Sequence, residues 1–334
     1  MSRCMNCGDG FSRNCPSAEP KVRPFRFAAA IGSPRSRTDF IHEVQEIERV
    51  GYDAVVLSDH LLDQFGPISA LGLAAGVTSR LGLGTFVFNN DLRHPVVLAQ
   101  ELATLDRLSD GRLLIGIGAG WNVPEYESIG IPFEAGSVRI DRLAEAITIL
   151  KGVFADGPID FQGRYYRVKG LADLPRPLQR PHPPFLLGGG SPRLLRLAAR
   201  EAQIVSIAPR VLADGTADVQ GCTFAGNARK IDLIRAAAGA RFESIDINTY
   251  PSLGAKLTDS SRSAAAEVAT RLRNRFHVDL SEEDVLDSPH VFIGSVDSLV
   301  QKFQRLRETL SINHIMVGEH WQDFVPVMER LRGT

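Results

Sequence analysis

The chain has 334 residues, of which 44% are hydrophobic, so it is long enough for one large core or two modest ones. Its 38 basic and 39 acidic residues nearly cancel, which argues against nucleic acid or an anionic membrane as a partner. We find neither an apolar run of the roughly 18 to 20 residues that a membrane span needs nor the apolar core of a signal peptide. We therefore expect a cytoplasmic protein that acts on a small-molecule substrate.

Residues 1–21 differ from the rest of the chain, being polar and holding three of the four cysteines. The Cys4-x-x-Cys7 spacing suggests zinc, but a structural zinc site needs four ligands and only Cys15 is nearby as a third. We expect a disordered leader or a start codon placed too far upstream, followed by a single domain over 22–334. So few cysteines exclude a disulfide scaffold for that domain.

From residue 23 onward, short apolar strands alternate with amphipathic helices. We expect strands at 25–31, 53–58, 81–88, 113–117, 184–187, 202–207, 244–250 and 312–317, and helices at 39–50, 67–79, 95–108, 137–154, 191–201, 227–239, 263–275, 296–309 and 321–331. This alternation is typical of a parallel sheet. Eight such units predict an α/β fold, a (β/α)8 TIM barrel, with insertions at 121–136, 156–183 (including a hairpin) and 252–290. A doubly wound open sheet is the main alternative.

The fourth expected strand ends in glycines. Leu113–Ile117 has no charge, and Gly118-Ala119-Gly120 follows it, leading into Trp121, Asn122 and Glu125. Missing side chains would let a ligand approach the backbone, although a tight turn without a ligand explains the glycines equally well. The pattern is not the dinucleotide fingerprint G-x-G-x-x-G, and we expect no helix directly after Asn122.

Two other expected strands are followed by residues that could bind a ligand or take part in a reaction. Asp59-His60 could bind a ring system or move a proton, or else be a helix cap and a structural histidine. Gly188-Gly189-Gly190-Ser191 opens a helix and favours a phosphate, or serves only as a turn. No metal-binding spacing is present, so we predict no metal. We expect His42, His277 and His290 on the surface.

These residues resemble the luciferase-like monooxygenase superfamily, and within it the oxidoreductases that depend on the deazaflavin coenzyme F420. The resemblance runs from about Phe25 to the C-terminus. It is carried by Gly51–His60, Arg80–Thr85, His94-Pro95 with Ala99-Gln100, Leu105–Arg112, Gly116–Asn122, Arg139-x-Asp141-Arg142-Leu143 and Gly163–Tyr166. Flavin mononucleotide (FMN) enzymes share most of these motifs.

The resemblance implies a luciferase-like barrel with the cofactor at its C-terminal mouth, and a homodimer. It implies a non-proline cis peptide at Phe86–Val87, against the back of the deazaflavin ring, and catalytic roles for His60 and Asp59. It also implies a set of cofactor-binding residues, namely Asp59, Thr85, Phe86, Val87, Gly118, Ala119, Gly120, Trp121, Asn122, Gly188, Gly189, Gly190 and Ser191.

One position departs from part of the family. Sugar-phosphate dehydrogenases of the family have a proton-donating glutamate where this chain has Trp121, which argues against a sugar phosphate. A tryptophan there suits a flat, apolar substrate or the cofactor ring. We favour a hydride-transferring oxidoreductase that uses coenzyme F420. The alternatives are a monooxygenase that uses reduced FMN and oxygen, and a non-catalytic barrel that binds a cofactor or a partner chain.

Overall fold

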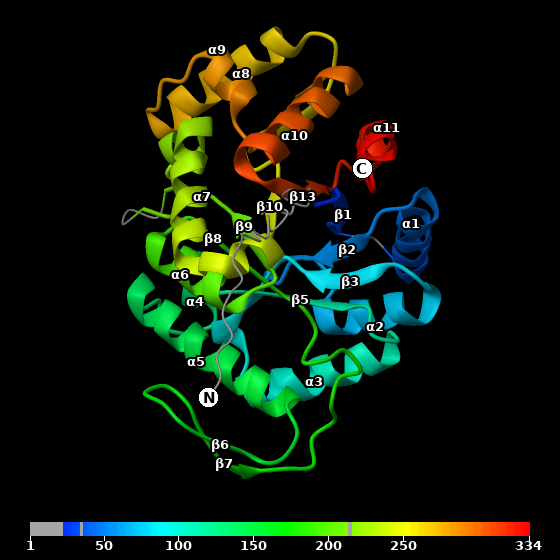
Figure 1. Cartoon of the computed structure of the whole chain (residues 1–334), viewed down its shortest axis with the longest axis vertical. Coiled ribbons are helices and arrows are strands. Elements are labelled where there is room, and N and C mark those ends of the chain that lie inside the picture. The colour runs from blue at the N-terminus through cyan, green and yellow to red at the C-terminus, as the bar shows by residue number, and fades with distance from the viewer. Residues whose placement is uncertain (1–22, 34–35, 213–215) are drawn as a thin grey trace, which may run out of the picture.

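The computed structural model describes residues 23–33, 36–212 and 216–334 (Figure 1). Residues 1–21, where we expect a leader and where the Cys4-x-x-Cys7 pair falls, lie outside the described residues. In the described part of the chain, no helix is both long enough and apolar enough to cross a bilayer.

Parallel strands form a closed barrel within the described residues. They pair in the order β3-β2-β1-β13-β10-β9-β8-β5-β4, and a further pairing of β3 with β5 closes the ring. The order confirms the barrel and excludes the open sheet. The strands are β1 (Arg26–Ile31), β2 (Ala54–Leu57), β3 (Gly82–Thr85), β4 (Phe88–Asn89), β5 (Leu113–Gly118), β8 (Phe185–Gly189), β9 (Ile204–Ile207), β10 (Asp246–Thr249) and β13 (Ile312–Gly318).

The predicted third strand, 81–88, is two strands in the structure. β3 ends at Thr85, the peptide bond between Phe86 and Val87 is cis, and β4 follows it. The cis peptide that the family resemblance implies is therefore confirmed at the expected position.

A ring of helices surrounds the barrel (Figure 1). The first shows why they form: Ser36 caps α1 by accepting the Asp39 N–H, and Gly51 ends it in the left-handed conformation. Phe40, Val44 and Ile47 recur on one face of α1 and are buried. The helices are α1 (Arg37–Val50), α2 (Pro67–Val77), α3 (Pro95–Leu108), α5 (Gly136–Phe154), α6 (Pro192–Glu201), α7 (Phe224–Ala238), α10 (Val296–Leu310) and α11 (Trp321–Leu331).

Side chains alternate between the two faces of the barrel wall. In β1, Phe27 and Ala29 pack outward with the helices, whereas Ala28 belongs to an interior cluster with Val56 and Met316. A second interior cluster joins Leu114, Leu186 and Ile204. Side chains therefore fill the interior of the barrel, which is a packed core and not a pore.

Two of the three expected insertions, 156–183 and 252–290, lie at opposite ends of the molecule (Figure 1). The expected hairpin is β6 (Ile159–Gln162) and β7 (Arg167–Leu171). The region 252–290 holds α8 (Ser261–Phe276), the predicted helix, together with α9 (Glu282–Asp287). It also begins a parallel pair that we did not predict, β11 (Gly254–Leu257) with β12 (Val291–Gly294), because four-residue strands give too short a pattern to recognise.

The expectation that no helix directly follows Asn122 is wrong. α4 (Val123–Ser128) begins at the next residue, with Pro124 in its first turn. Proline is favoured there because its missing N–H would have no partner in a first turn anyway. The strand–glycine–helix order therefore exists, but within a barrel and with a six-residue helix.

Candidate active site at the C-terminal mouth of the barrel

The predicted site residues come from four strand ends. Asp59 and His60 follow β2, Phe86 follows β3, Gly118 ends β5, and Gly188–Ser191 spans the end of β8 and the start of α6. Since the barrel strands pair in parallel, their C-terminal ends meet at one rim, which is where barrel enzymes place their chemistry.

Asp59 is buried and fully engaged by protein groups. Arg93 donates to both carboxylate oxygens, at 2.6 and 2.9 Å, and the backbone N–H of Asn89 donates to Oδ2 at 2.9 Å. The Arg93 guanidinium also lies over the Phe88 ring. These contacts favour an anchoring role, in which Asp59 ties the end of β2 to the segment after β4. The catalytic role of Asp59 stays a prediction.

His60 is paired with a carboxylate that sequence reasoning did not connect to it. Its Nδ1 lies 2.8 Å from Oε1 of Glu125 in α4, and the Leu61 N–H donates to the same oxygen at 3.3 Å. The His60 and Trp121 rings meet edge to face, with centroids 5.6 Å apart. The structure therefore brings together an imidazole, a buried carboxylate and an indole that is 56% exposed.

Phe86 and Val87 form an apolar floor at the mouth. Both pack on the interior cluster of Leu114, Leu186 and Ile204, and Phe86 meets Tyr250 edge to face at 5.1 Å. Thr85, just before the cis peptide, is fully buried and donates its hydroxyl to the Gly116 carbonyl at 2.7 Å. Its contact is thus with the barrel wall.

The glycines of β5 and of the loop that follows it leave room for the protein's own atoms. A Cβ at Gly116 would lie 1.8 Å from the Thr85 carbonyl oxygen, and one at Gly118 would lie 2.8 Å from the Val87 side chain. Gly120 has φ +75°, and its Cβ would lie 1.9 Å from the Tyr126 hydroxyl. Close packing therefore explains these glycines, and their predicted contact with a cofactor stays a prediction.

The glycines after β8 are also closely packed. A Cβ at Gly189 would meet Leu194, and one at Gly190 would lie 2.4 Å from the backbone nitrogen of Arg210. Ser191 is the N-cap of α6, accepting the Leu194 N–H at 3.3 Å. The structure therefore places a capped helix N-terminus at the rim, as the sequence predicts, and phosphate binding there stays a prediction.

A hydrogen-bonded network fixes α4 behind the site. The buried Tyr126 hydroxyl contacts Asn89 Oδ1 and Asp91 Oδ2, each at 3.0 Å, and burial raises the pKa of Tyr126 to about 12. Arg142 of α5 pairs with Asp91 at 3.0 Å, and Arg139 donates to the Gly120 carbonyl at 3.0 Å. The Arg139-x-Asp141-Arg142 run of the family resemblance was the signal that could have revealed this network.

Two other histidines, His290 and His314, are buried. In the barrel wall, His314 accepts from the Asn248 amide at 2.8 Å, and burial lowers its pKa to about 4. His290 contacts Asn227 Oδ1 and the Tyr250 carbonyl, and burial lowers its pKa to about 3. The expectation that His290 lies on the surface is wrong. Its ring is buried because Asn227, 63 positions away in the sequence, supplies a hydrogen-bond partner inside the protein. His42 and His277 are exposed, as expected.

We expect acid to destabilise the protein through His314 and His290. Both have folded pKa values below the ordinary 6.5, so the stability they contribute is complete above pH 6.5. It is lost as the pH falls toward 4 for His314 and toward 3 for His290. Each of the two histidines should lower the free energy of unfolding by about 2 kcal/mol at pH 5 relative to pH 7.5. Urea unfolding at both pH values measures this, and His314→Gln should shrink the difference. Exposed His42→Gln is the control, and an equal effect of the two substitutions would contradict the prediction.

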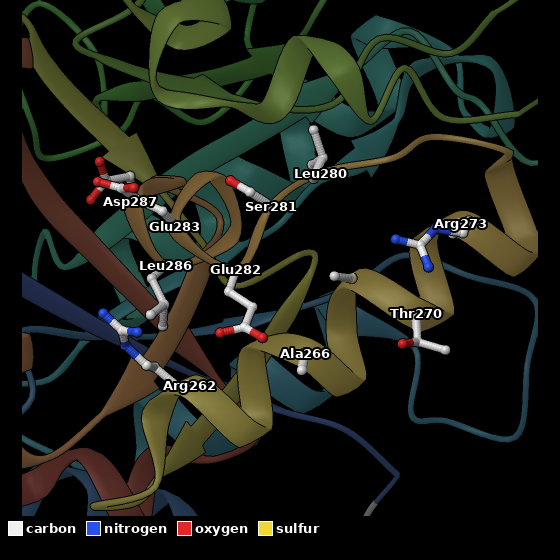
Figure 2. Close-up of a pocket in the computed structure, with 11 residues that line it drawn as sticks. Arg262, Ala266, Thr270, Arg273, Leu280, Ser281, Glu282, Glu283, Leu286 and Asp287 are labelled. Carbon is white, nitrogen blue, oxygen red and sulfur yellow. The ribbon is translucent and has the colours of Figure 1, made fainter.

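A separate groove, about 700 Å³ in volume, lies between α8 and α9. Figure 2 labels its lining residues on α8, among them Arg262 and Thr270, and those of the 280–287 segment, among them Glu282. The residues that line this groove all come from the 252–290 insertion, and none of them is a predicted site residue. The groove is lined by both basic and acidic side chains, so its charge does not favour a ligand of either sign. Among the described residues, no group of three or more His, Cys, Asp or Glu is placed to hold a metal.

A parallel (β/α)8 barrel with an imidazole–carboxylate pair at its C-terminal rim defines the class of protein. Residues 22–291 match the profile of the luciferase-like monooxygenases, and the chain belongs to that family. The fold resembles the coenzyme F420-dependent tetrahydromethanopterin reductase from Methanopyrus kandleri, with a TM-score of 0.73 over 93% of this chain and 99% of that one, at 18% identity.

Curated relatives match over shorter stretches. An F420-dependent glucose-6-phosphate dehydrogenase from Microbacterium testaceum (strain StLB037) is 35% identical over 164 residues, which is 47% of this chain and 48% of that protein. An FMNH(2)-dependent dimethylsulfone monooxygenase from Pseudomonas putida is 29% identical over 178 residues, 53% of this chain and 46% of that protein. The chain thus spans about half the length of the curated relatives it matches.

Proposed function

We propose that this protein is a cytoplasmic oxidoreductase, acting as a homodimer, that transfers a hydride between coenzyme F420 and a small organic substrate. The observation that carries the proposal is the His60–Glu125 pair at the barrel mouth, where a held imidazole can exchange a proton with a reactant. The F420-dependent enzymes among its relatives support the choice of cofactor.

The mouth fits a flat cofactor with an anionic side chain. Phe86 and Val87 offer an apolar floor for a ring, and the N-terminus of α6 at Ser191 offers backbone N–H groups for a phosphate. When bound, coenzyme F420 would supply the hydride chemistry. The protein would hold the ring, exclude water and move the accompanying proton through His60, while Asp59 would anchor the rim through Arg93.

The exposed surface near His60 supports a flat, apolar substrate. Leu61 is 49% exposed and Leu62 is 66% exposed, and the Trp121 indole beside His60 is also exposed. Apolar side chains left in water next to a polar pair are typical of a binding surface. Relatives named as glucose-6-phosphate dehydrogenases make a sugar phosphate the comparison substrate in any screen.

We expect the full chain to bind coenzyme F420 at least tenfold more tightly than FMN, a difference of about 1.4 kcal/mol. Parallel titrations of the two cofactors, followed by fluorescence, measure this. Measuring oxygen uptake with each reduced cofactor then separates the reactions, because a deazaflavin lacks the nitrogen that makes reduced flavins react with oxygen. Tighter binding of FMN with oxygen uptake would favour the monooxygenase. If either cofactor binds but no candidate substrate is turned over, the non-catalytic barrel would be favoured.

A further inference from the structure

Glu125 is placed to control which nitrogen of His60 carries a proton. The two residues are 65 positions apart in sequence, and their closest atoms, His60 Nδ1 and Glu125 Oε1, are 2.8 Å apart. The Glu125 side chain is 7% exposed and the His60 side chain 25%. An ionised carboxylate only accepts hydrogen bonds, so Nδ1 must be the protonated nitrogen in this contact. In the neutral ring, Nε2 is then left as an acceptor.

Neighbouring contacts hold Glu125 where it is. The same Oε1 accepts the Leu61 N–H at 3.3 Å, so the carboxylate joins the His60 side chain to the backbone of the next residue. The adjacent Tyr126 is fully buried and hydrogen-bonded to Asn89 and Asp91. Because α4 is fixed on this side, the carboxylate cannot follow a rotating imidazole without breaking its own contacts.

The other edge of the imidazole is free for a reactant. In the part of the chain that the structure describes, His60 Nε2 has no hydrogen-bond partner, while the Trp121 ring meets the imidazole edge to face at 84°. A carboxylate that fixes one nitrogen of a histidine, and so presents the other in a set tautomer, is a recurring arrangement at catalytic sites.

We propose that Glu125 is a positioning residue that locks His60 in the Nδ1–H tautomer and thereby presents Nε2 to the substrate. This inference rests on the proposed function. For an alcohol substrate whose C–H hydride goes to bound coenzyme F420, Nε2 would take the proton released from the hydroxyl, leaving a carbonyl compound. In reduction, the protonated Nε2 returns that proton to the oxygen. Glu125 itself gives up no proton and touches no reactant in either direction.

Histidine nitrogen NMR tests the tautomer without any substrate. In the ¹⁵N-labelled full chain at a pH where His60 is neutral, we expect Nδ1 to be protonated and Nε2 unprotonated, with His60→Asn used to assign the signals. Glu125→Ala should release this tautomer. Glu125→Gln should keep it, because the amide oxygen can still accept from both Nδ1–H and the Leu61 N–H. Glu127→Ala, an exposed change on the same helix, is the matched control. An unchanged His60 tautomer in Glu125→Ala would overturn the proposal.

Kinetics test whether the lock matters for proton transfer. With a substrate on which the wild type turns over coenzyme F420, Glu125→Ala should lower kcat about 10- to 100-fold, and the Kd for F420 should stay unchanged. Glu125→Gln should lose less, which keeps the test usable if the alanine variant does not fold. A wild-type kcat in a Glu125→Ala variant that has lost the tautomer would overturn the proposal. Failure of the proposed function is separate, because it appears in the wild type as weak F420 binding.

Discussion

Arg93→Ala is expected to cost about 3–5 kcal/mol of unfolding free energy. The Asp59 side chain is 5% exposed beside Arg93, and the substitution leaves its carboxylate with only the Asn89 N–H as a partner. An uncompensated buried charge is expensive because the surrounding protein replaces water poorly. The same change should loosen the rim between β2 and β4. Urea unfolding at pH 7.5 measures the loss.

Two further variants identify the cause of the loss. Asp59→Asn combined with Arg93→Ala removes the charge and keeps an acceptor for the Asn89 N–H, so it should recover part of the stability. Arg273→Ala breaks a pair with Asp279 whose side chains are both more than half exposed, and should cost less than about 1 kcal/mol. If Arg93→Ala proved no more harmful than Arg273→Ala, the anchoring role of Asp59 would be wrong.

Gly116→Ala is the second large expected effect, with a loss of about 3 kcal/mol or more. Its Cβ would lie 1.8 Å from the Thr85 carbonyl oxygen and 2.8 Å from the carbonyl carbon, so backbone must move to admit it. That movement would strain the Thr85 hydroxyl bond to the Gly116 carbonyl, which joins β3 to β5 where the barrel closes. Denaturation midpoints with unchanged slopes measure the loss.

Gly72→Ala is the matched control for this prediction. Gly72 lies inside α2, and a Cβ there would have no atom within 4 Å. Alanine favours a helix over glycine by roughly 0.5–1 kcal/mol, so this variant should be neutral or slightly more stable. Equal stability of the Gly116→Ala and Gly72→Ala variants would show that β5 tolerates a side chain at this position and would contradict the packing account.

The sequence alone determined the barrel and the rim that carries the site. The spacing of apolar residues predicts eight strand–helix units. Because the strands pair in parallel, their C-terminal ends share one rim, which holds Asp59-His60, Gly118–Asn122 and Gly188–Ser191. The family resemblance added the cis peptide at Phe86–Val87. These features are local in the chain, so their patterns can be read without knowing what packs against them.

Only the tertiary structure decided what the individual side chains contact. Glu125 reaches His60 across 65 positions, and Arg93 reaches Asp59 across 34, through contacts that no spacing rule encodes. The glycines of β5 and of the loop after it suggested ligand contact in the sequence, yet the space beside them is taken by Thr85, Val87 and Tyr126. The physical reason is that packing partners are set by how distant strands and helices meet, and a sequence pattern records only the need for a small residue or a polar one.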